Sequence, residues 1–224
     1  MRKILLVAAM ATMFNMSAFG AYIFGDSGGI LGHLTITTTT GVFENDAFDQ
    51  GWWSDTAAND PANTNYIASN VGIPPDDLGF NTNNFFAFRL GQGFITGDIL
   101  SATLTLLNPA SGWSGPATGA TYHLWDVSTD INTLTAPDSA NAGIYNDLGS
   151  GAAYGSQHVG PADDGLNVVV NITGQGLIDL QNAYKNTSLF AIGGSLGPAE
   201  VPEPAAFALM GAGLVALAFM RRRN

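Results

Sequence analysis

Several short segments between residues 34 and 192 alternate apolar and polar residues with a period of two. In the segment at 100–106, for example, three Leu and one Ala alternate with Ser and Thr. Such alternation is typical of a β-strand with one buried face. Strands are therefore predicted at residues 34–37, 86–90, 100–106, 122–127, 166–172 and 189–192.

One helix is predicted at residues 177–185, where Leu177, Leu180 and Tyr184 fall on one face at helical spacing. Clusters of Asn, Asp, Gly and Pro, which favour turns, separate the predicted strands. Many short strands and one late helix favour an all-β fold in a single domain. We expect a jelly-roll-like β-sandwich with one short helix, in which two sheets enclose the core.

The N-terminal end of the chain differs from this body. Arg2 and Lys3 precede the apolar run 4–14, and small residues at Ala18 and Gly20 follow it. This is the pattern of a secretory signal peptide over residues 1–20, since the apolar run is shorter than the ~20 residues that a membrane span needs. Export is therefore expected, with cleavage before Ala21; cleavage after Ala18 fits the same pattern.

The C-terminal end combines three features. Residues 205–220 are uncharged and apolar or small, and as a helix they would rise about 24 Å, which is marginal for a bilayer span. Arg221, Arg222 and Arg223 follow this segment and would hold its end on the cytoplasmic side. The two prolines of the preceding segment 201–204 keep its backbone extended and accessible to a processing enzyme.

In this order the three features resemble the PEP-CTERM sorting signal of Gram-negative bacteria. The resemblance implies that an exosortase in the inner membrane recognises the sorting segment and processes the membrane-anchored precursor. It also implies transfer to the cell surface or extracellular matrix, in association with exopolysaccharide. The alternative is an ordinary C-terminal anchor. The residues that the resemblance makes part of the signal are Val201, Pro202, Glu203, Pro204, Arg221, Arg222 and Arg223.

The charge of the body restricts its partners. Residues 22–199 contain 16 acidic and two basic side chains, a formal charge of −14. A protein that neutralises phosphates needs clustered Lys and Arg, so the sequence excludes nucleic acid as a partner. The chain has no Cys, so an exported body must be stabilised without disulfides. The chain thus divides into a signal peptide (1–20), a β-sandwich domain (21–199) and a sorting signal (200–224).

A second resemblance concerns the body. Residues 84–90 followed by 99–106 resemble a strand pair of jelly-roll modules in bacterial surface proteins, and residues 168–173 with 190–192 resemble the strands that close such modules. Some of these modules bind acidic polysaccharide. A body at −14 repels an anionic polymer unless salt screens the charges or calcium bridges them, whereas a neutral glycan meets no such barrier.

A hydrolytic function is the third candidate. Residues 25–29, Gly-Asp-Ser-Gly-Gly, resemble the nucleophile segment of chymotrypsin-type proteases, and residues 24–27 resemble the N-terminal block of Gly-Asp-Ser esterases. Those esterases carry Asp three residues before the catalytic His, and neither His33, His123 nor His158 has it. A serine without a paired base is not activated. We therefore expect a turn-forming segment and no catalysis.

Two sets of loop residues are candidates for binding. Five oxygen-bearing side chains could hold a structural calcium ion or simply form turns: Asp55, Asn59, Asp60, Asn63 and Asn65. Four aromatic residues in polar or Gly-rich loops could contact a glycan or anchor the loops by packing: Trp52, Trp53, Tyr66 and Trp113. Trp125 lies in a predicted strand and is expected in the core.

The sequence predicts an exported, exosortase-processed surface or matrix protein with a non-catalytic structural or adhesive role. The alternative is a carbohydrate-binding module that uses the loop aromatics, with calcium assisting the binding. A Gly-Asp-Ser-type esterase is a distant third.

Overall fold

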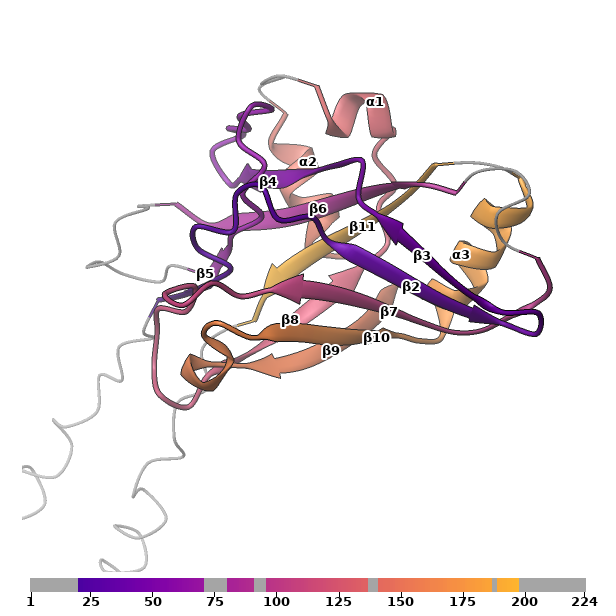
Figure 1. The fold of residues 1–224 in the computed structure, drawn as a ribbon. Helices are drawn as coiled ribbons and strands as arrows, with labels where there is room; N and C mark the ends of the chain where they lie inside the picture. The colour runs from indigo at the N-terminus through magenta and orange to yellow at the C-terminus, as the bar shows by residue number, and fades with distance from the viewer. Residues whose placement is uncertain (1–19, 71–79, 91–95, 137–140, 187–188, 198–224) are drawn as a thin grey trace, which may run out of the picture.

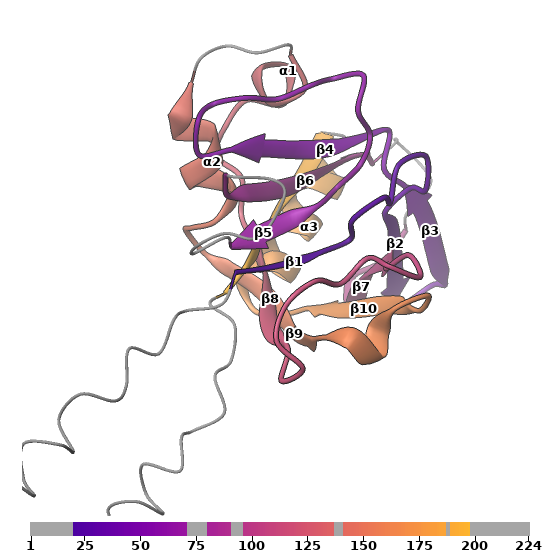
Figure 2. The same ribbon diagram turned by 90° about the vertical axis from the view of Figure 1, so that its left-hand side faces the viewer.

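The computed structural model describes residues 20–70, 80–90, 96–136, 141–186 and 189–197. Within these ranges the chain forms two antiparallel sheets (Figures 1 and 2). Sheet A has the strand order β1-β5-β6-β11-β8-β9, and β4 pairs with β6 outside this path. Sheet B has the order β10-β7-β2-β3. The β-rich body that the sequence predicts is confirmed.

The strands of sheet A are β1 (Ala21–Ile23), β4 (Asp49–Ser54), β5 (Ala68–Asn70), β6 (Thr82–Arg89), β8 (Ala120–Trp125), β9 (Ala153–Val159) and β11 (Leu189–Leu196). The strands of sheet B are β2 (His33–Thr38), β3 (Val42–Asp46), β7 (Ile99–Leu107) and β10 (Asn167–Ile172). The helices are α1 (Ile131–Leu134), α2 (Ala142–Leu148) and α3 (Gln175–Lys185), with a 3₁₀ turn at Pro161–Asp163.

The main core lies between the two sheets. Sheet B contributes alternate residues of β2, β7 and β10, such as Leu34, Leu104 and Val170, and each of these side chains is fully buried. Sheet A contributes Phe86 and Tyr122, which are also fully buried. Period-two alternation therefore places one face of each strand in this core and the other outside, as the sequence predicts.

Two apolar residues lie outside the core although they continue the alternation. Leu100 is 60% exposed and Leu166 is 56% exposed. The β2–β7 register shifts between Thr37 and Thr38, close to Leu100, and Leu166 precedes the first residue of β10. Alternation thus predicted the faces correctly only where the ladder is regular.

Helix α3 begins two residues before the predicted start and ends at the predicted residue. It closes one end of the space between the sheets (Figure 1), where Leu180 is fully buried and Leu177 and Tyr184 pack against the core. The expectation of a single helix is wrong, since α1 and α2 are also present. Both are short, and their segments lack the sustained helical spacing that identified α3.

Helices α1 and α2 cover the outer face of sheet A, which points away from sheet B (Figure 2). A second buried cluster forms there, made of Trp53, Phe85, Leu134, Ile144, Leu148 and Ala191. Strand β6 is therefore buried on both faces along seven of its eight residues. This accounts for its nearly continuous apolar and amide sequence, which a half-buried strand would not need.

Among the described residues, no helix is both long and apolar enough to cross a membrane. The predicted signal peptide and the predicted C-terminal span lie outside the described ranges.

Asp147 fastens α2 to the segment before α1. Its carboxylate accepts hydrogen bonds from the backbone N–H and hydroxyl groups of both Ser128 and Thr129, at 2.5–3.3 Å. Burial alone would raise the pKa of Asp147, but these hydrogen bonds stabilise the carboxylate and hold the pKa below its usual value.

Asp147→Asn is expected to lower the free energy of unfolding at pH 7 by about 1 kcal/mol, a modest value because the carboxylate is only partly buried. Because the folded-state pKa of Asp147 lies below the unfolded value of 3.8, its stabilisation is present above that pH. It is lost as pH falls through the folded-state value. Denaturant titrations from pH 7 to pH 2.5 should show the two proteins converging in acid. A constant difference across this range would contradict the assignment.

Candidate functional site

A pocket of about 220 Å³ combines aromatic and polar side chains at one end of sheet A. Its walls come from β1, the following loop, β4 and the loop between β4 and β5. The lining residues used below are Tyr22, Asp26, Trp52, Asn63, Asn65 and Phe80. Three of these, Trp52, Asn63 and Asn65, are residues that the sequence singled out, in two separate candidate sets. We call this the Trp52 pocket.

The aromatic wall is a pair of stacked rings. Trp52 is half-buried and lies with its ring centroid 5.7 Å from that of Phe80, at an interplanar angle of 27°. Tyr22 is also half-buried and completes the apolar part of the wall. Tyr22 and Phe80 carry no sequence motif, and Asp26 lies in the Gly-Asp-Ser segment, which was considered only for its serine, so sequence reasoning missed all three as pocket residues.

The loop that carries Asp26 has an uncommon backbone. Phe24 and Asp26 adopt left-handed conformations, with φ of 63° and 56°. A bulky residue with positive φ is strained, and such residues persist only where the surroundings hold them. Here the backbone N–H of the fully buried Phe24 donates to Asn108 Oδ1 at 3.0 Å. The predicted turn is therefore present, and the contact with Asn108 holds its strained backbone in place.

Ser27 is fully buried and acts as a crosslink between two loops. Its hydroxyl donates to Asn65 Oδ1 at 2.7 Å and accepts from the backbone N–H of Tyr66 at 3.0 Å. The side chain on which the esterase resemblance rests therefore lies inside the body, in two structural hydrogen bonds. These contacts hold Asn65 at the edge of the Trp52 pocket.

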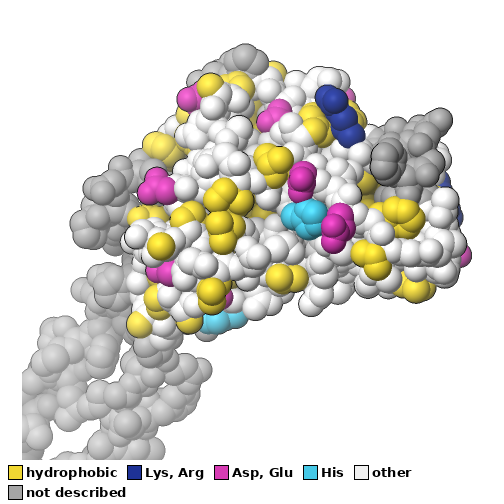
Figure 3. Space-filling model, in the orientation of Figure 1, with side chains coloured by type: hydrophobic (Ala, Val, Ile, Leu, Met, Phe, Trp, Pro, Cys, Tyr) yellow, Lys and Arg dark blue, Asp and Glu magenta, His cyan; other side chains and the backbone are white. Residues whose placement is uncertain are grey.

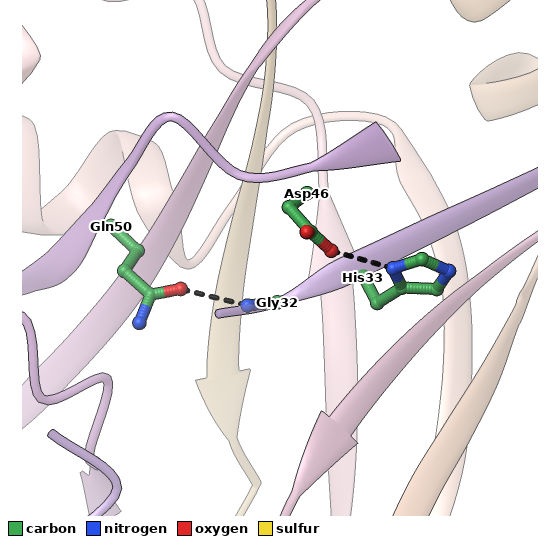
Figure 4. Close-up of polar contacts among 4 residues, drawn as sticks. All are labelled: Gly32, His33, Asp46 and Gln50. Carbon is green, nitrogen blue, oxygen red and sulfur yellow. Dashed lines mark hydrogen bonds and ion pairs between the residues drawn. The ribbon is translucent and has the colours of Figure 1, made fainter. Parts of the chain in front are cut away.

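The side chain of Gln50 connects two loops beside the Trp52 pocket (Figure 4). Its side-chain carbonyl accepts from the backbone N–H of Gly32 at 2.8 Å, and its amide donates to Ile30 O at 2.6 Å and Thr64 O at 3.0 Å. Next to this crosslink, His33 Nδ1 lies 2.6 Å from Asp46 Oδ1 across the β2–β3 pair. One buried side chain thus joins the loop before β2 to the loop after β4.

Three of the four candidate glycan contacts are core residues, and for these the expectation does not fit the structure. Trp53 and Tyr66 are fully buried and Trp113 is 8% exposed, so none presents an open ring face. The Trp53 indole donates to Leu134 O at 3.0 Å. Burial raises the pKa of Tyr66 to about 12, so its hydroxyl stays protonated and donates to Leu107 O. Only Trp52 keeps a surface position.

The five candidate calcium ligands do not gather at one point. Asp55 accepts a hydrogen bond from Asn81, whereas Asn59 donates to Ala136 O. The carboxylate of Asp60 accepts from a backbone N–H two residues ahead, as does the side-chain oxygen of Asn63. Within the described ranges, no three Asp, Glu, His or Cys side chains are grouped as a metal site requires. A structural calcium ion at these residues stays a prediction.

The chemistry of the Trp52 pocket suits a ring with hydroxyl groups. The stacked aromatic wall offers an apolar face, and Asp26, Asn63 and Asn65 offer hydrogen-bonding groups. Within the described residues, the Asp26 carboxylate and the two side-chain NH₂ groups make no hydrogen bond to the protein. At about 220 Å³ the pocket is smaller than the roughly 300–1,000 Å³ of most small-molecule sites, so it fits a single ring.

A comparison with known protein families matches residues 200–223 to the PEP-CTERM protein-sorting motif. The chain carries a PEP-CTERM sorting signal. This confirms the resemblance seen at Val201–Pro204 and the terminal arginines, which lie outside the described residues. The motif implies an exported protein that exosortase recognises in a membrane-anchored precursor. No curated protein and no solved structure matches the chain, and the motif itself says nothing of the body.

Gln50→Leu is expected to lower the free energy of unfolding by about 2 kcal/mol, because it leaves the buried N–H of Gly32 and the part-buried carbonyls of Ile30 and Thr64 without their partner. The matched control is Gln157→Leu, at an exposed position of β9 where the side chain makes only a local hydrogen bond. Urea titration of both variants checks this. Equal losses in the two would show that the Gln50 crosslink does not stabilise the body.

Proposed function

We propose that this PEP-CTERM protein is a non-catalytic structural or adhesive component of the cell surface or extracellular matrix of a Gram-negative bacterium, associated with exopolysaccharide. The observation that carries the proposal is the sorting motif at residues 200–223 behind a β-rich body. The signal peptide at 1–20, a membrane-spanning helix before the terminal arginines and a jelly-roll relationship of the body belong to the same proposal.

The surface of the body supports this location. Figure 3 shows one face, on which acidic side chains are scattered among uncharged ones and Lys or Arg is sparse. A net charge of this sign keeps a protein soluble and disfavours phosphate-bearing partners. The body also builds its buried cores without Cys, so its stability does not depend on the redox state outside the cell.

The alternative is a carbohydrate-binding module, assisted by calcium. The Trp52 pocket favours it, because one half-buried candidate aromatic and two candidate calcium ligands line the same small space. The esterase has less support, since Ser27 is fully buried and hydrogen-bonded.

Deleting Pro202–Pro204 is expected to block processing, because exosortase would lose the segment that it recognises. The uncleaved protein should migrate at a larger size and stay in the membrane fraction, whereas the parent chain reaches the surface. Immunoblots of fractionated cells measure both. Thr103→Ala, on the outer face of sheet B, is the control for a general effect of substitution on export. Unchanged size and location of the deletion variant would contradict the sorting proposal.

The carbohydrate-binding alternative is tested by co-sedimentation of the full chain with the host's extracellular polysaccharide. If calcium assists, retention should fall several-fold when a chelator replaces calcium, and Asn63→Ala should lower retention in calcium. Retention that is insensitive to chelator would exclude calcium and leave the aromatic rings as the contact. Absence of retention in both conditions would leave the structural role alone.

A further inference from the structure

The outer face of sheet A bears two hollows in the part that α1 and α2 leave open. The first, of about 470 Å³, lies between β6, β11 and α2, and its lining includes Asn70, Asn81, Asn83, Tyr145, Ser150 and Ser195. The second, of about 420 Å³, lies along β8, β9 and the end of β10, and its lining includes His123, Gly155, Ser156, Asn171 and Thr173. Sequence analysis singled out none of these residues as a binding group.

The two hollows adjoin each other through directly paired residues. Ser195 of the first hollow faces His123 of the second in the β11–β8 pair, and His123 faces Ser156 in the β8–β9 pair. Neighbours paired in this way share one face of a sheet. The hollows therefore lie side by side on one face, across β6, β11, β8 and β9, and we call the two together the groove. At about 4.8 Å between strands it extends for roughly 14 Å, a length that suits several sugar residues.

An aromatic ring outside both linings contacts one lining residue of each hollow. Trp125 is half-buried, so the sequence-based expectation that it lies in the core is wrong. Its indole N–H donates to Ser195 Oγ at 2.8 Å, and its ring centroid lies 5.6 Å from that of His123 at an interplanar angle of 31°. These two contacts fix the orientation of the ring beside Ser195 and His123.

The described lining of the groove carries no charge, within a strongly acidic body. Among the residues that the structure describes, neither hollow is lined by Asp, Glu, Lys or Arg, although residues 22–199 carry 16 carboxylates. Burial lowers the pKa of His123, so the imidazole is neutral at pH 7. Amide and hydroxyl groups line most of the rest. The described lining therefore offers no counter-charge to an ionic ligand, and the carboxylates of the body disfavour an anionic one.

We propose that this groove binds a single chain of a neutral polysaccharide, with one sugar ring stacked on Trp125. Amide and hydroxyl side chains are suited to the sugar hydroxyls, to which they can both donate and accept hydrogen bonds. A flat, oriented indole suits the apolar face of a pyranose ring. The proposal rests on the proposed surface or matrix location, and it assigns the polymer to the outer face of sheet A and not to the Trp52 pocket.

Affinity electrophoresis of the full chain in detergent tests this. Native gels would contain hydroxyethylcellulose, dextran or galactomannan as neutral probes and alginate as the anionic probe. At least one neutral polymer should retard the protein, and alginate should not. Trp125→Ala should weaken that binding at least tenfold, as expected for a central aromatic contact. Ser156→Leu, at an exposed strand position, should also weaken binding, because it fills the second hollow without touching the core.

Thr103→Ala, on the outer face of sheet B, is the control for a general effect of substitution, and thermal melting verifies that each variant folds. If Trp125→Ala unfolds the body, Ser156→Leu decides the question. Retardation by none of the neutral polymers, stronger binding to alginate, or binding unchanged by both groove variants would overturn the proposal. Loss of binding in Trp52→Ala alone would also overturn it, and would place the ligand in the loop pocket. Because localisation is measured in cells, failure of the groove is distinguishable from failure of the sorting proposal.

Discussion

The fold depends on the burial of β6 on both of its faces. Phe86 and Phe88 point into the core between the sheets, whereas Phe85 points into the cluster beneath α1 and α2. A strand in this position exposes almost no backbone, so its polar groups must all find partners. Strands β4, β5 and β11 pair with it, and Asn83 and Asn84 donate from its end to Tyr145 O and Tyr66 O.

This constraint divides the outer face of sheet A into two parts. Where Trp53, Phe85 and Ala191 make the face apolar, α1 and α2 cover it and form the second buried cluster. Beyond this cover the outward residues change to Asn, Ser, His and Trp, and the face stays open as the groove. A sheet face that stays open to solvent requires side chains that water hydrates well. Amide and hydroxyl side chains meet that requirement without adding charge.

The sequence predicts the parts of the structure in which a local pattern has one physical cause. Strands β2, β7 and β10 alternate because one face is buried, and α3 has an apolar stripe because one side packs on the core. Strands β1, β3, β4, β5 and β9 escaped prediction. Strands β1, β3 and β5 are short, β4 is largely buried on both faces, and β9 is exposed at four of its seven residues, so none of them shows sustained alternation of apolar and polar residues. The PEP-CTERM signal was predictable because its three features are contiguous.

Binding residues were harder to predict because burial depends on tertiary contacts. Trp52 and Trp53 are sequence neighbours with opposite environments, since adjacent strand residues point to opposite faces. Asn65 is of a residue type that binds calcium, but its side-chain oxygen accepts a hydrogen bond from the Ser27 hydroxyl. Its place in the loop is therefore explained by this crosslink without a metal.

Trp125 was expected in the core, but its strand places it on an outer face. Composition identified the right residue types, but pairing register decides which of them meet: Ser195, His123 and Ser156 come from three distant segments and become neighbours only through the β11–β8–β9 ladder.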